Sequence, residues 1–372
     1  MLSGLRIVEF EALGPAPFAA MTLADLGAEV IVIHRKSGGE TPGKPSHNIL
    51  DRGKKSIALD LKSAKDLEIA QKLIASADGL IEGFRPGVME RLGLGPDALL
   101  STHKHLVYGR MTGWGQTGPR AQQAGHDLNY ISLTGALWYA SNPGEPPFTP
   151  PTLVGDIGGG ALYLVVGMLS ALIRARQSGK GSVVDAAIVD GTAHMMALLL
   201  ALRSSGGLQT ERGQSTLDGP HWSRCYACKG GGYISVQCLE PKFYVEFLRL
   251  LSLDQDADFQ KQFDKSLWPE LSARLAGIFA GKSQDYWQEF FAGTDACVAP
   301  VLSPDGSVED PHMIARQIWQ HTQGHLQPAP APRFSAWTPP EPAHIHAKDA
   351  DRKEILEDLR KRDKDAASSV LL

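Results

Sequence analysis

Residues 1–190 alternate between short apolar runs and stretches in which apolar positions recur every three or four residues. The apolar runs predict buried parallel strands at 7–10, 28–33, 56–61, 79–81, 106–110 and 182–188. The helical spacing predicts helices at 17–26, 64–76 and 158–177. Such alternation predicts an α/β unit in which helices cover a parallel sheet.

The pattern changes after residue 206, where a polar, glycine-rich stretch to residue 220 is typical of a connector. Beyond it, the spacing predicts a strand at 232–238, helices at 241–251, 268–279 and 285–293, and a loop at 300–310. This second pattern of elements predicts a smaller α+β domain.

Composition narrows the class of protein. The 372-residue chain is 43% apolar and 21% charged, as soluble globular proteins are. Its net charge of −4 argues against nucleic acid or an anionic membrane as the main partner, because both favour a basic surplus. The longest apolar run, at 162–173, is too short to span a bilayer, and the N-terminus has the pattern of a strand rather than a signal peptide. We therefore expect a cytoplasmic protein.

Neither a metal nor a nucleotide cofactor is expected. Cys225 and Cys228 form a single C-x-x-C pair, with Cys238 and His221 nearby, but the second pair of a zinc site is missing. Four cysteines in a chain of this length also suggest no disulfide framework. The first strand–helix turn, at 11–17, is not G-x-G-x-x-G, so it does not predict an ordinary dinucleotide site.

Candidate chemistry lies at two breaks in the pattern, one of them at His126. This histidine follows Gly125, and Asp127 and Asn129 beside it supply hydrogen-bonding groups. Histidine is also the side chain whose ordinary pKa best suits acid–base work near neutral pH.

The second break is at Asp156, just before the predicted helix at 158–177. An Asp there can be a helix N-cap, but capping does not explain Gly155 before it and glycines at 158–160 after it. Glycines let another molecule approach the backbone, free N–H groups at a helix start suit an oxyanion or phosphate, and the helix dipole favours a charged carboxylate. Because a neighbouring His and Asp can pass a proton to and from carbon, acid–base chemistry is the leading hypothesis.

Basic residues come after or between the N-terminal strands, and parallel sheets bind ligands beyond the carboxyl ends of their strands. Each alone is most simply a solvated charge, but together they fit a ligand with several phosphates. They are Arg35, Lys36, Arg52, Lys54, Lys55, Lys62, Arg85 and Arg91. Glu240, which precedes Pro241, would alone be an ordinary turn residue.

With these segments in view, the chain resembles the class III CoA-transferase superfamily, and within it most closely the α-methylacyl-CoA racemases. The resemblance runs from Leu2 to about Phe334. It rests on several motifs in the right order, at 23–30, 81–88, 90–93, 111–119, 179–186, 217–219, 240–244 and 295–301, and on the segments around His126 and Asp156. The segment at 220–224 and Lys242 depart from the racemase pattern, which puts the acyl-chain preference in doubt.

The resemblance implies an interlocked homodimer in which each subunit has a Rossmann-like large domain and a small α+β domain. The active site would lie between the large domain of one subunit and the small domain of the other. The expected ranges are 1–187 for the large domain, 188–224 and 309–330 for linkers, 225–308 for the small domain, and 331–372 for a C-terminal segment that returns to the large domain.

The resemblance also implies residue roles. His126 and Asp156 would face the α-carbon of a 2-methylacyl-CoA from opposite sides, and the backbone N–H of Asp127 would bind the thioester oxygen. Glu240 of the partner subunit would support His126. CoA, which is part of the substrate, would bind the large domain at Arg35, Leu59, Asp60, Leu61, Lys62, Gly83, Arg85 and Arg91.

Three functions follow, of which a racemase or epimerase working without a cofactor is the leading one. The second is a CoA-transferase with Asp156 as the nucleophile that carries the acyl group; the transferases of the superfamily lack the histidine, so His126 argues against it. The third is a non-catalytic acyl-CoA-binding protein, against which the retained His126–Asp156 pair argues. The acyl chain itself stays open.

Overall fold

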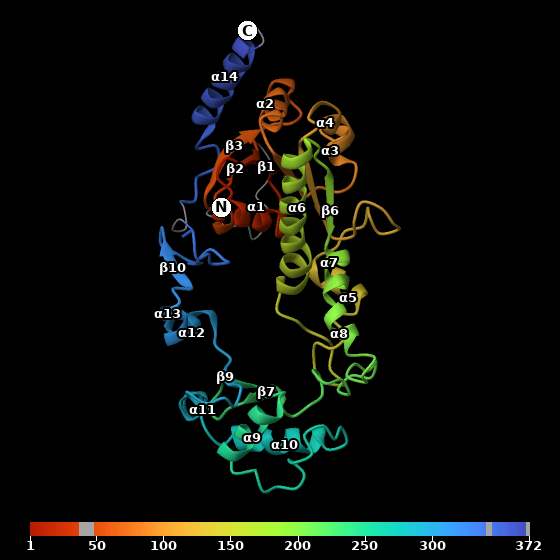
Figure 1. The fold of residues 1–372 in the computed structure, drawn as a ribbon, viewed down its shortest axis with the longest axis vertical. Helices are drawn as coiled ribbons and strands as arrows, with labels where there is room; N and C mark the ends of the chain where they lie inside the picture. The colour runs from red at the N-terminus through yellow and green to blue at the C-terminus, as the bar shows by residue number, and fades with distance from the viewer. Residues whose placement is uncertain (37–47, 340–343, 370–372) are drawn as a thin grey trace. The chain divides into compact units, whose positions relative to one another are not determined.

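The computed structural model describes residues 1–36, 48–339 and 344–369, and these form two compact units (Figure 1). Within the described residues, the first unit comprises 1–134, 150–195 and 317–372, and the second comprises 135–149 and 196–316. The domain ranges inferred from the sequence remain a prediction.

A six-stranded sheet forms the centre of the first unit. Its order is β3–β2–β1–β4–β5–β6, with all neighbouring strands parallel, which is the strand order of the Rossmann fold. The strands are β1 (Arg6–Phe10), β2 (Glu29–Arg35), β3 (Lys54–Leu59), β4 (Gly79–Glu82), β5 (Val107–Thr112) and β6 (Val183–Ala187). The expected α/β class with a parallel sheet is confirmed.

Helices bury both faces of this sheet, which explains why its strands are near-continuous apolar runs. Ile7 and Val8 are neighbours on β1, yet they belong to two separate core clusters because successive strand residues point to opposite faces. Helices α1 (Pro15–Asp25) and α6 (Leu162–Ser178) contribute to the first cluster. Helices α2 (Ala64–Ala75) and α14 (Arg352–Ser369) contribute to the second.

Shorter elements complete the first unit. They are η1 (Ile49–Asp51), α3 (Val88–Arg91), α4 (Pro96–Thr102), α5 (Asp127–Thr134), the π-helix η2 (Leu153–Ala161), α7 (Ile188–Met195) and the antiparallel pair β10 (Trp319–Thr322) and β11 (His325–Pro328). The C-terminal segment covers the edge strand β3: the carboxylates of Asp349 and Asp351 accept hydrogen bonds from the amides of Ala58 and Ser56.

The apolar helix of this unit is longer than the sequence predicted. Together η2 and α6 give one helical stretch, Leu153–Ser178, of 26 residues, which by length and composition alone could cross a membrane. The expectation that this stretch is too short is therefore wrong. Leu164, Met168 and Leu172 nevertheless pack into the core beside the sheet, as in the core helix of an α/β unit.

The second unit contains an antiparallel sheet of order β7–β8–β9 with helices packed on it. The strands are β7 (Ser223–Ala227), β8 (Tyr233–Gln237) and β9 (Val298–Pro300); the helices are α8 (Ala197–Ala201), α9 (Pro241–Leu250), α10 (Trp268–Phe279), α11 (Gln284–Phe291), α12 (Pro304–Glu309) and α13 (Pro311–Ala315). Its core is rich in aromatic side chains such as Trp222, Phe247 and Phe279. The smaller α+β unit expected from the sequence is thus present.

One local prediction in this unit is wrong. The segment 300–310 is not a continuous loop, because α12 forms at Pro304–Glu309. Ser303 caps this helix by accepting a hydrogen bond from the amide of Gly306, and Pro304 occupies a first-turn position that suits proline.

Candidate active site

His126 and Asp156 come from two helix starts in the first unit. His126 immediately precedes α5, and Asp156 lies in the first turn of the π-helix η2. Isolated π-helical turns are frequent at functional sites. The imidazole is exposed, whereas Asp156 is half-buried.

Asp127 joins the two helix starts. Its carboxylate oxygen Oδ1 accepts hydrogen bonds from the backbone amides of Gly155 and Asp156, both at 2.8 Å. The Asp127 side chain is buried, and a Cβ on Gly155 would overlap its Oδ1. Glycine at 155 therefore lets the two segments approach each other.

The Asp156 carboxyl has a raised pKa of about 6. Burial is the largest cause, the negative charge of Asp127 adds to it, and the charge of His126 opposes it. These interactions place the three side chains in one electrostatic site. The helix dipole was expected to favour the charged form of Asp156; burial and the like charge of Asp127 act in the opposite direction and raise its pKa, but at about 6 the carboxyl is still mostly charged at pH 7.

The carboxyl group of Asp156 also lies close to the N-terminus of α1. Asp156 Oδ2 lies 3.4 Å from where a Cβ would stand on Gly14, the N-cap residue of that helix. Gly14 has φ of 67° and ψ of −112°, a backbone conformation that favours glycine. Sequence reasoning missed this neighbour, although the Gly14–Pro15 pair between a strand and a helix is a signal for such a turn.

A hydrogen-bond network fixes the loop that carries His126. Its amide donates to Asn129 Oδ1 at 3.1 Å, and its carbonyl accepts from the Asn129 amide at 2.8 Å, which starts α5. The hydroxyl of Tyr130 donates to the carbonyl of Gly125, and the ring of Tyr130 meets Trp114 edge-on at 4.7 Å. Tyr130 and Trp114 were not predicted as site residues, because their contacts with the loop depend on the fold.

The amides at the two helix starts differ in availability. Among the described residues, the backbone N–H groups of Asp127 and Leu128 have no hydrogen-bond acceptor, as is usual in the first turn of a helix. Those of Gly155 and Asp156 are occupied by Asp127. The expectation that free N–H groups next to Asp156 could bind an oxyanion is therefore wrong for these two amides.

The predicted CoA-binding residues line the carboxyl edge of the parallel sheet. Arg35 ends β2 and pairs in register with Leu59, which ends β3 and is followed by Asp60, Leu61 and Lys62. Gly83 and Arg85 follow β4, and Arg91 ends α3. Within the described ranges, no carboxylate pairs with the exposed Arg35, Lys62, Arg85 or Arg91, so these side chains are available to an anion.

Three basic residues of the proposed phosphate cluster have structural roles instead. Arg52 is buried against Asp25 and the carbonyl of Pro328, and Lys54 Nζ lies 2.6 Å from Glu9 in the core. Lys55 pairs with Glu29 at 2.9 Å and with Glu354 at 2.7 Å. These residues lie at the start of β3 or just before it, away from the carboxyl edge, so including them in a phosphate site is wrong. Lys36 pairs with Asp66 at 3.3 Å.

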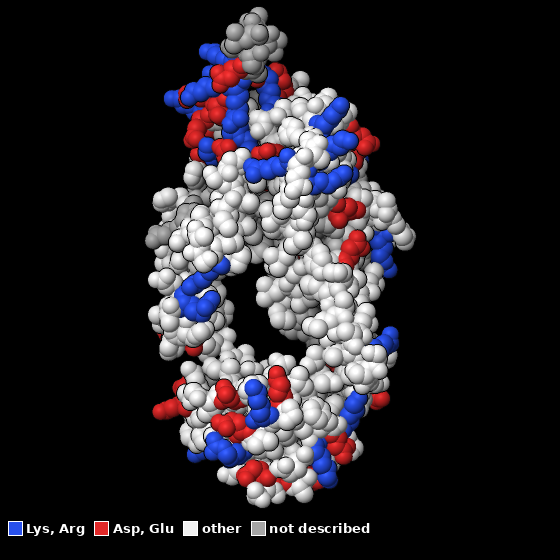
Figure 2. Space-filling model, in the orientation of Figure 1, with Lys and Arg blue, Asp and Glu red and all other residues white. Residues whose placement is uncertain are grey.

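Figure 2 shows Lys and Arg side chains mixed with Asp and Glu over the end of the first unit that carries α14, α3 and α4. In the same view, the surface over the half of α6 that lies farther from α14 shows little charge. Exposed apolar side chains of α6 include Leu162, Val166 and Ile173. The first unit therefore has both a charged end and an apolar face.

Glu240 lies in the second unit, at the N-cap position of α9. Its carbonyl accepts hydrogen bonds from the amides of Phe243 and Tyr244, both at 3.0 Å, and its side chain is exposed. Its predicted action on His126 of another subunit stays a prediction. No group of three or more His, Cys, Asp or Glu side chains with the geometry of a metal site occurs in the part of the chain that the structure describes.

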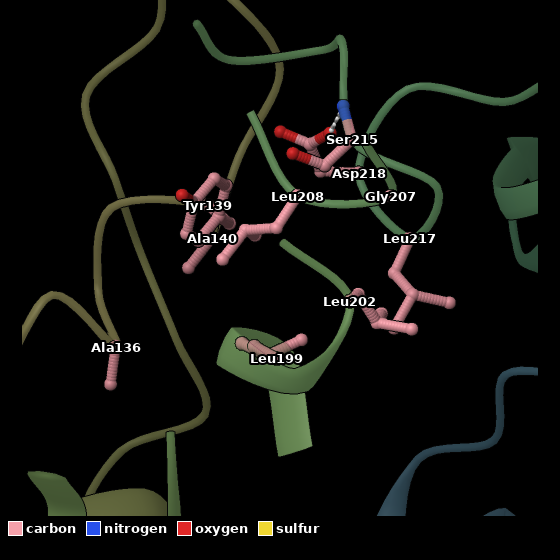
Figure 3. Close-up of a pocket in the computed structure, with 10 residues that line it drawn as sticks. All are labelled: Ala136, Tyr139, Ala140, Leu199, Leu202, Gly207, Leu208, Ser215, Leu217 and Asp218. Carbon is pink, nitrogen blue, oxygen red and sulfur yellow. Dashed lines mark hydrogen bonds between the residues drawn. The ribbon is translucent and has the colours of Figure 1, made fainter. Parts of the chain in front are cut away.

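The second unit also contains an apolar pocket of about 240 Å³ (Figure 3). Leucine and alanine side chains, including Ala136, Leu199 and Leu208, line most of it. Its one carboxylate, Asp218, accepts hydrogen bonds from the amides of Gly213 and Ser215, both at 2.8 Å. Because that carboxylate is occupied by the backbone, the pocket contains no evident reaction centre.

Comparison with known proteins assigns the family. A family model described as CoA-transferase family III matches residues 2–349. The chain belongs to CoA-transferase family III. The resemblance inferred from the motifs, and the expectation of an enzyme of this family, are confirmed.

Two curated relatives and one solved structure are informative. The chain is 39% identical to the alpha-methylacyl-CoA racemase of Mus musculus, over 89% of this chain and 85% of that protein. It is 37% identical to the alpha-methylacyl-CoA racemase of Homo sapiens, over 89% of this chain and 86% of that protein. A CaiB/BaiF family protein from Brucella suis has the same fold, with a TM-score of 0.80 at 24% identity over 96% of this chain and 98% of that chain.

Proposed function

We propose that this chain is a racemase that inverts the α-carbon of 2-methylacyl-CoA thioesters by proton transfer between two bases. The observation that carries the proposal is that the Asp127 carboxylate ties the segment of His126 to the amide of Asp156, so that the two bases share one site. The likeness to two racemases over most of the chain supports it.

Each base would serve one face of the substrate. The α-proton of a thioester is weakly acidic, so its removal requires a positioned base and a stabilised enolate oxygen. One group takes the proton from one face, and the other delivers a proton to the opposite face of the planar enolate. The raised pKa of Asp156, about 6, suits this work because a base near the working pH both accepts and returns protons efficiently.

The enolate oxygen would be stabilised by the backbone N–H of Asp127. That amide lies at the positive end of α5 and is free of an acceptor among the described residues. Donors aimed at the developing charge strengthen their hydrogen bonds as the enolate forms, and this lowers the barrier. Removing one such donor typically costs about 10²–10³ in rate.

The CoA part of the substrate would bind along the carboxyl edge of the sheet. Arg35, Arg85 and Arg91 are exposed there, and guanidinium groups form paired hydrogen bonds with phosphates. The order reversal beside β1 makes this edge the usual place for a ligand in such sheets. No cofactor beyond the substrate is proposed, and the protein is proposed to be cytoplasmic.

The active form is proposed to be a homodimer. Three features of the first unit support a partner surface: Val166 and Ile173 on α6 are 63% and 60% exposed, β6 is a sheet edge, and Val183 on β6 is also exposed. Exposed apolar surface of this kind is a feature of protein interfaces. A partner would also supply Glu240 to the site.

The test follows the α-proton of a 2-methylacyl-CoA of known configuration by NMR in D2O. Exchange with loss of optical purity is expected for the unchanged protein. His126→Ala and Asp156→Ala should each abolish racemisation and retain CoA binding in calorimetry, whereas full activity of either variant would refute the two-base scheme.

The family also contains CoA-transferases, in which Asp156 would act as a nucleophile. A transferase would form a new thioester when a second carboxylic acid is added, and a racemase would form none. A new thioester without α-proton exchange would therefore replace the proposal. CoA binding with neither reaction would point to a binding protein.

A further inference from the structure

The side chain of Asp127 has a position that its backbone role does not explain. Its amide begins α5, yet its carboxylate points away to the start of η2, and the residue as a whole is only 7% exposed. The inference that follows rests on the proposed function and concerns this side chain alone.

The carboxylate replaces a missing helix cap. The N-cap residue of η2 is Thr152, which has φ of 60° and makes no capping hydrogen bond with its side chain. The first amides of such a helix need acceptors. Asp127 Oδ1 supplies them from another helix, by accepting from the consecutive amides of Gly155 and Asp156.

These contacts also fix the distance between the two bases. His126 is the chain neighbour of Asp127, and Asp156 donates its own amide to the Asp127 carboxylate. Gly155 has no side chain to hold the two segments apart. A Cβ at this position would also lie 2.8 Å from Ile131 on α5. A rigid, buried bridge of this kind holds reacting groups within the tolerance that catalysis requires.

We propose that Asp127 is a positioning residue, whose side chain locks the first turn of η2 and holds a negative charge beside Asp156. The two contributions are separable. The hydrogen bonds need only an oxygen acceptor, whereas the effect on Asp156 needs the negative charge. In keeping with this, the charge of Asp127 contributes to the raised pKa of Asp156.

Two variants separate these contributions. Asp127→Asn keeps an Oδ1 acceptor and removes the charge, so the folded structure should persist. The pKa of Asp156 should then fall, and the acid limb of the pH–rate profile should move about one pH unit lower. Asp127→Ala removes the acceptor as well, so hydrogen exchange at the amides of Gly155 and Asp156 should become at least about tenfold faster.

The control is Asp190→Asn, which removes one exposed negative charge of the same unit that does not shift the pKa of Asp156. It should leave both the pH profile and the amide exchange unchanged. NMR titration of carbon-13-labelled aspartate carboxyls reports the pKa of Asp156 without relying on turnover. A failure of racemisation in the unchanged protein would therefore refute the proposed function while this inference is still tested.

An unchanged Asp156 titration in Asp127→Asn would overturn the electrostatic part. Unchanged exchange at the two amides in a folded Asp127→Ala would overturn the positioning part. If Asp127→Ala does not fold, Asp127→Leu, which preserves volume but offers no acceptor, replaces it. The same exchange criterion then decides.

Discussion

Gly155 gives the most direct test of the close approach between α5 and η2. Its backbone has no positive φ, so alanine at this position meets only a steric cost. A new Cβ would overlap Asp127 Oδ1 and lie 2.8 Å from Ile131 Cγ2. Because ordinary contacts are wider, the two segments must separate by about 1 Å, and the contacted residues Asp127 and Ile131 are both buried.

The expected cost follows from that displacement. Forcing an extra carbon into a packed site destabilises by about 1–3 kcal/mol. A shift of about 1 Å between catalytic groups typically costs about 10²-fold in rate. Gly155→Ala should therefore unfold at lower urea concentration and racemise about a hundredfold more slowly.

Gly277→Ala is the matched control. Gly277 lies in the last turn of α10, is exposed, and has no atom within 4 Å of a built Cβ. Alanine there should stabilise the helix by about 1 kcal/mol and leave racemisation unchanged. The assay pairs urea unfolding with α-proton exchange in D2O. If Gly155→Ala matches Gly277→Ala in both measurements, the close-approach argument fails.

Three further predictions concern charge. Because the pKa of Asp156 is raised in the folded state, it contributes stability that is fully present below the ordinary pKa near 3.8 and is lost as pH rises through about 6. Asp156→Asn lacks this titration. In urea unfolding it should therefore gain stability relative to the unchanged protein between pH 4 and pH 7. Lys54→Met leaves Glu9 buried and unpaired, so it should lower the free energy of unfolding by about 3–5 kcal/mol. Lys55→Met removes only partly exposed ion pairs and should lower it by less than about 1 kcal/mol. Equal losses in the two variants would contradict this. Arg91→Ala should weaken CoA binding several-fold in calorimetry, and the loss should shrink in added salt; a salt-independent loss would argue against a phosphate contact.

The parallel sheet could be predicted because its strands are buried on both faces. The run at 28–33, for example, gives β2, which extends only two residues further, to Arg35. Strand β7 gave no such signal, since Ser223 and Arg224 interrupt its apolar pattern and the strand lies at a sheet edge. Hydrophobic patterning reveals burial, so half-exposed strands escape it.

Ion pairs set a second limit on sequence reasoning. Arg52 and Lys54 looked like phosphate ligands because their partners, Asp25 and Glu9, lie 27 and 45 positions away in the sequence. Only the folded chain brings these charges together. Arg35 and Arg91 have no such partner among the described residues, so their side chains remain available to bind an anion.

The glycines around Asp156 show how a correct signal can have a different cause. The sequence suggested that they admit a ligand to the backbone. Instead they admit other parts of the chain: a Cβ on Gly155 would meet Asp127, one on Gly159 would overlap Thr192, and one on Gly160 would lie 3.0 Å from Ile188. The backbone of the π-helix therefore packs closely against α5 and α7, and the amides of Gly155 and Asp156 are hydrogen-bonded to Asp127.

This packing limits which amides could bind the enolate oxygen of the proposed reaction. With the amides of Gly155 and Asp156 occupied, the free donors nearest to His126 are those at the start of α5. In the proposed mechanism, Asp127 would present its free amide to the substrate, while its carboxylate binds the other helix. Any variant that alters the carboxylate leaves that amide in the chain, so the two roles can be measured separately.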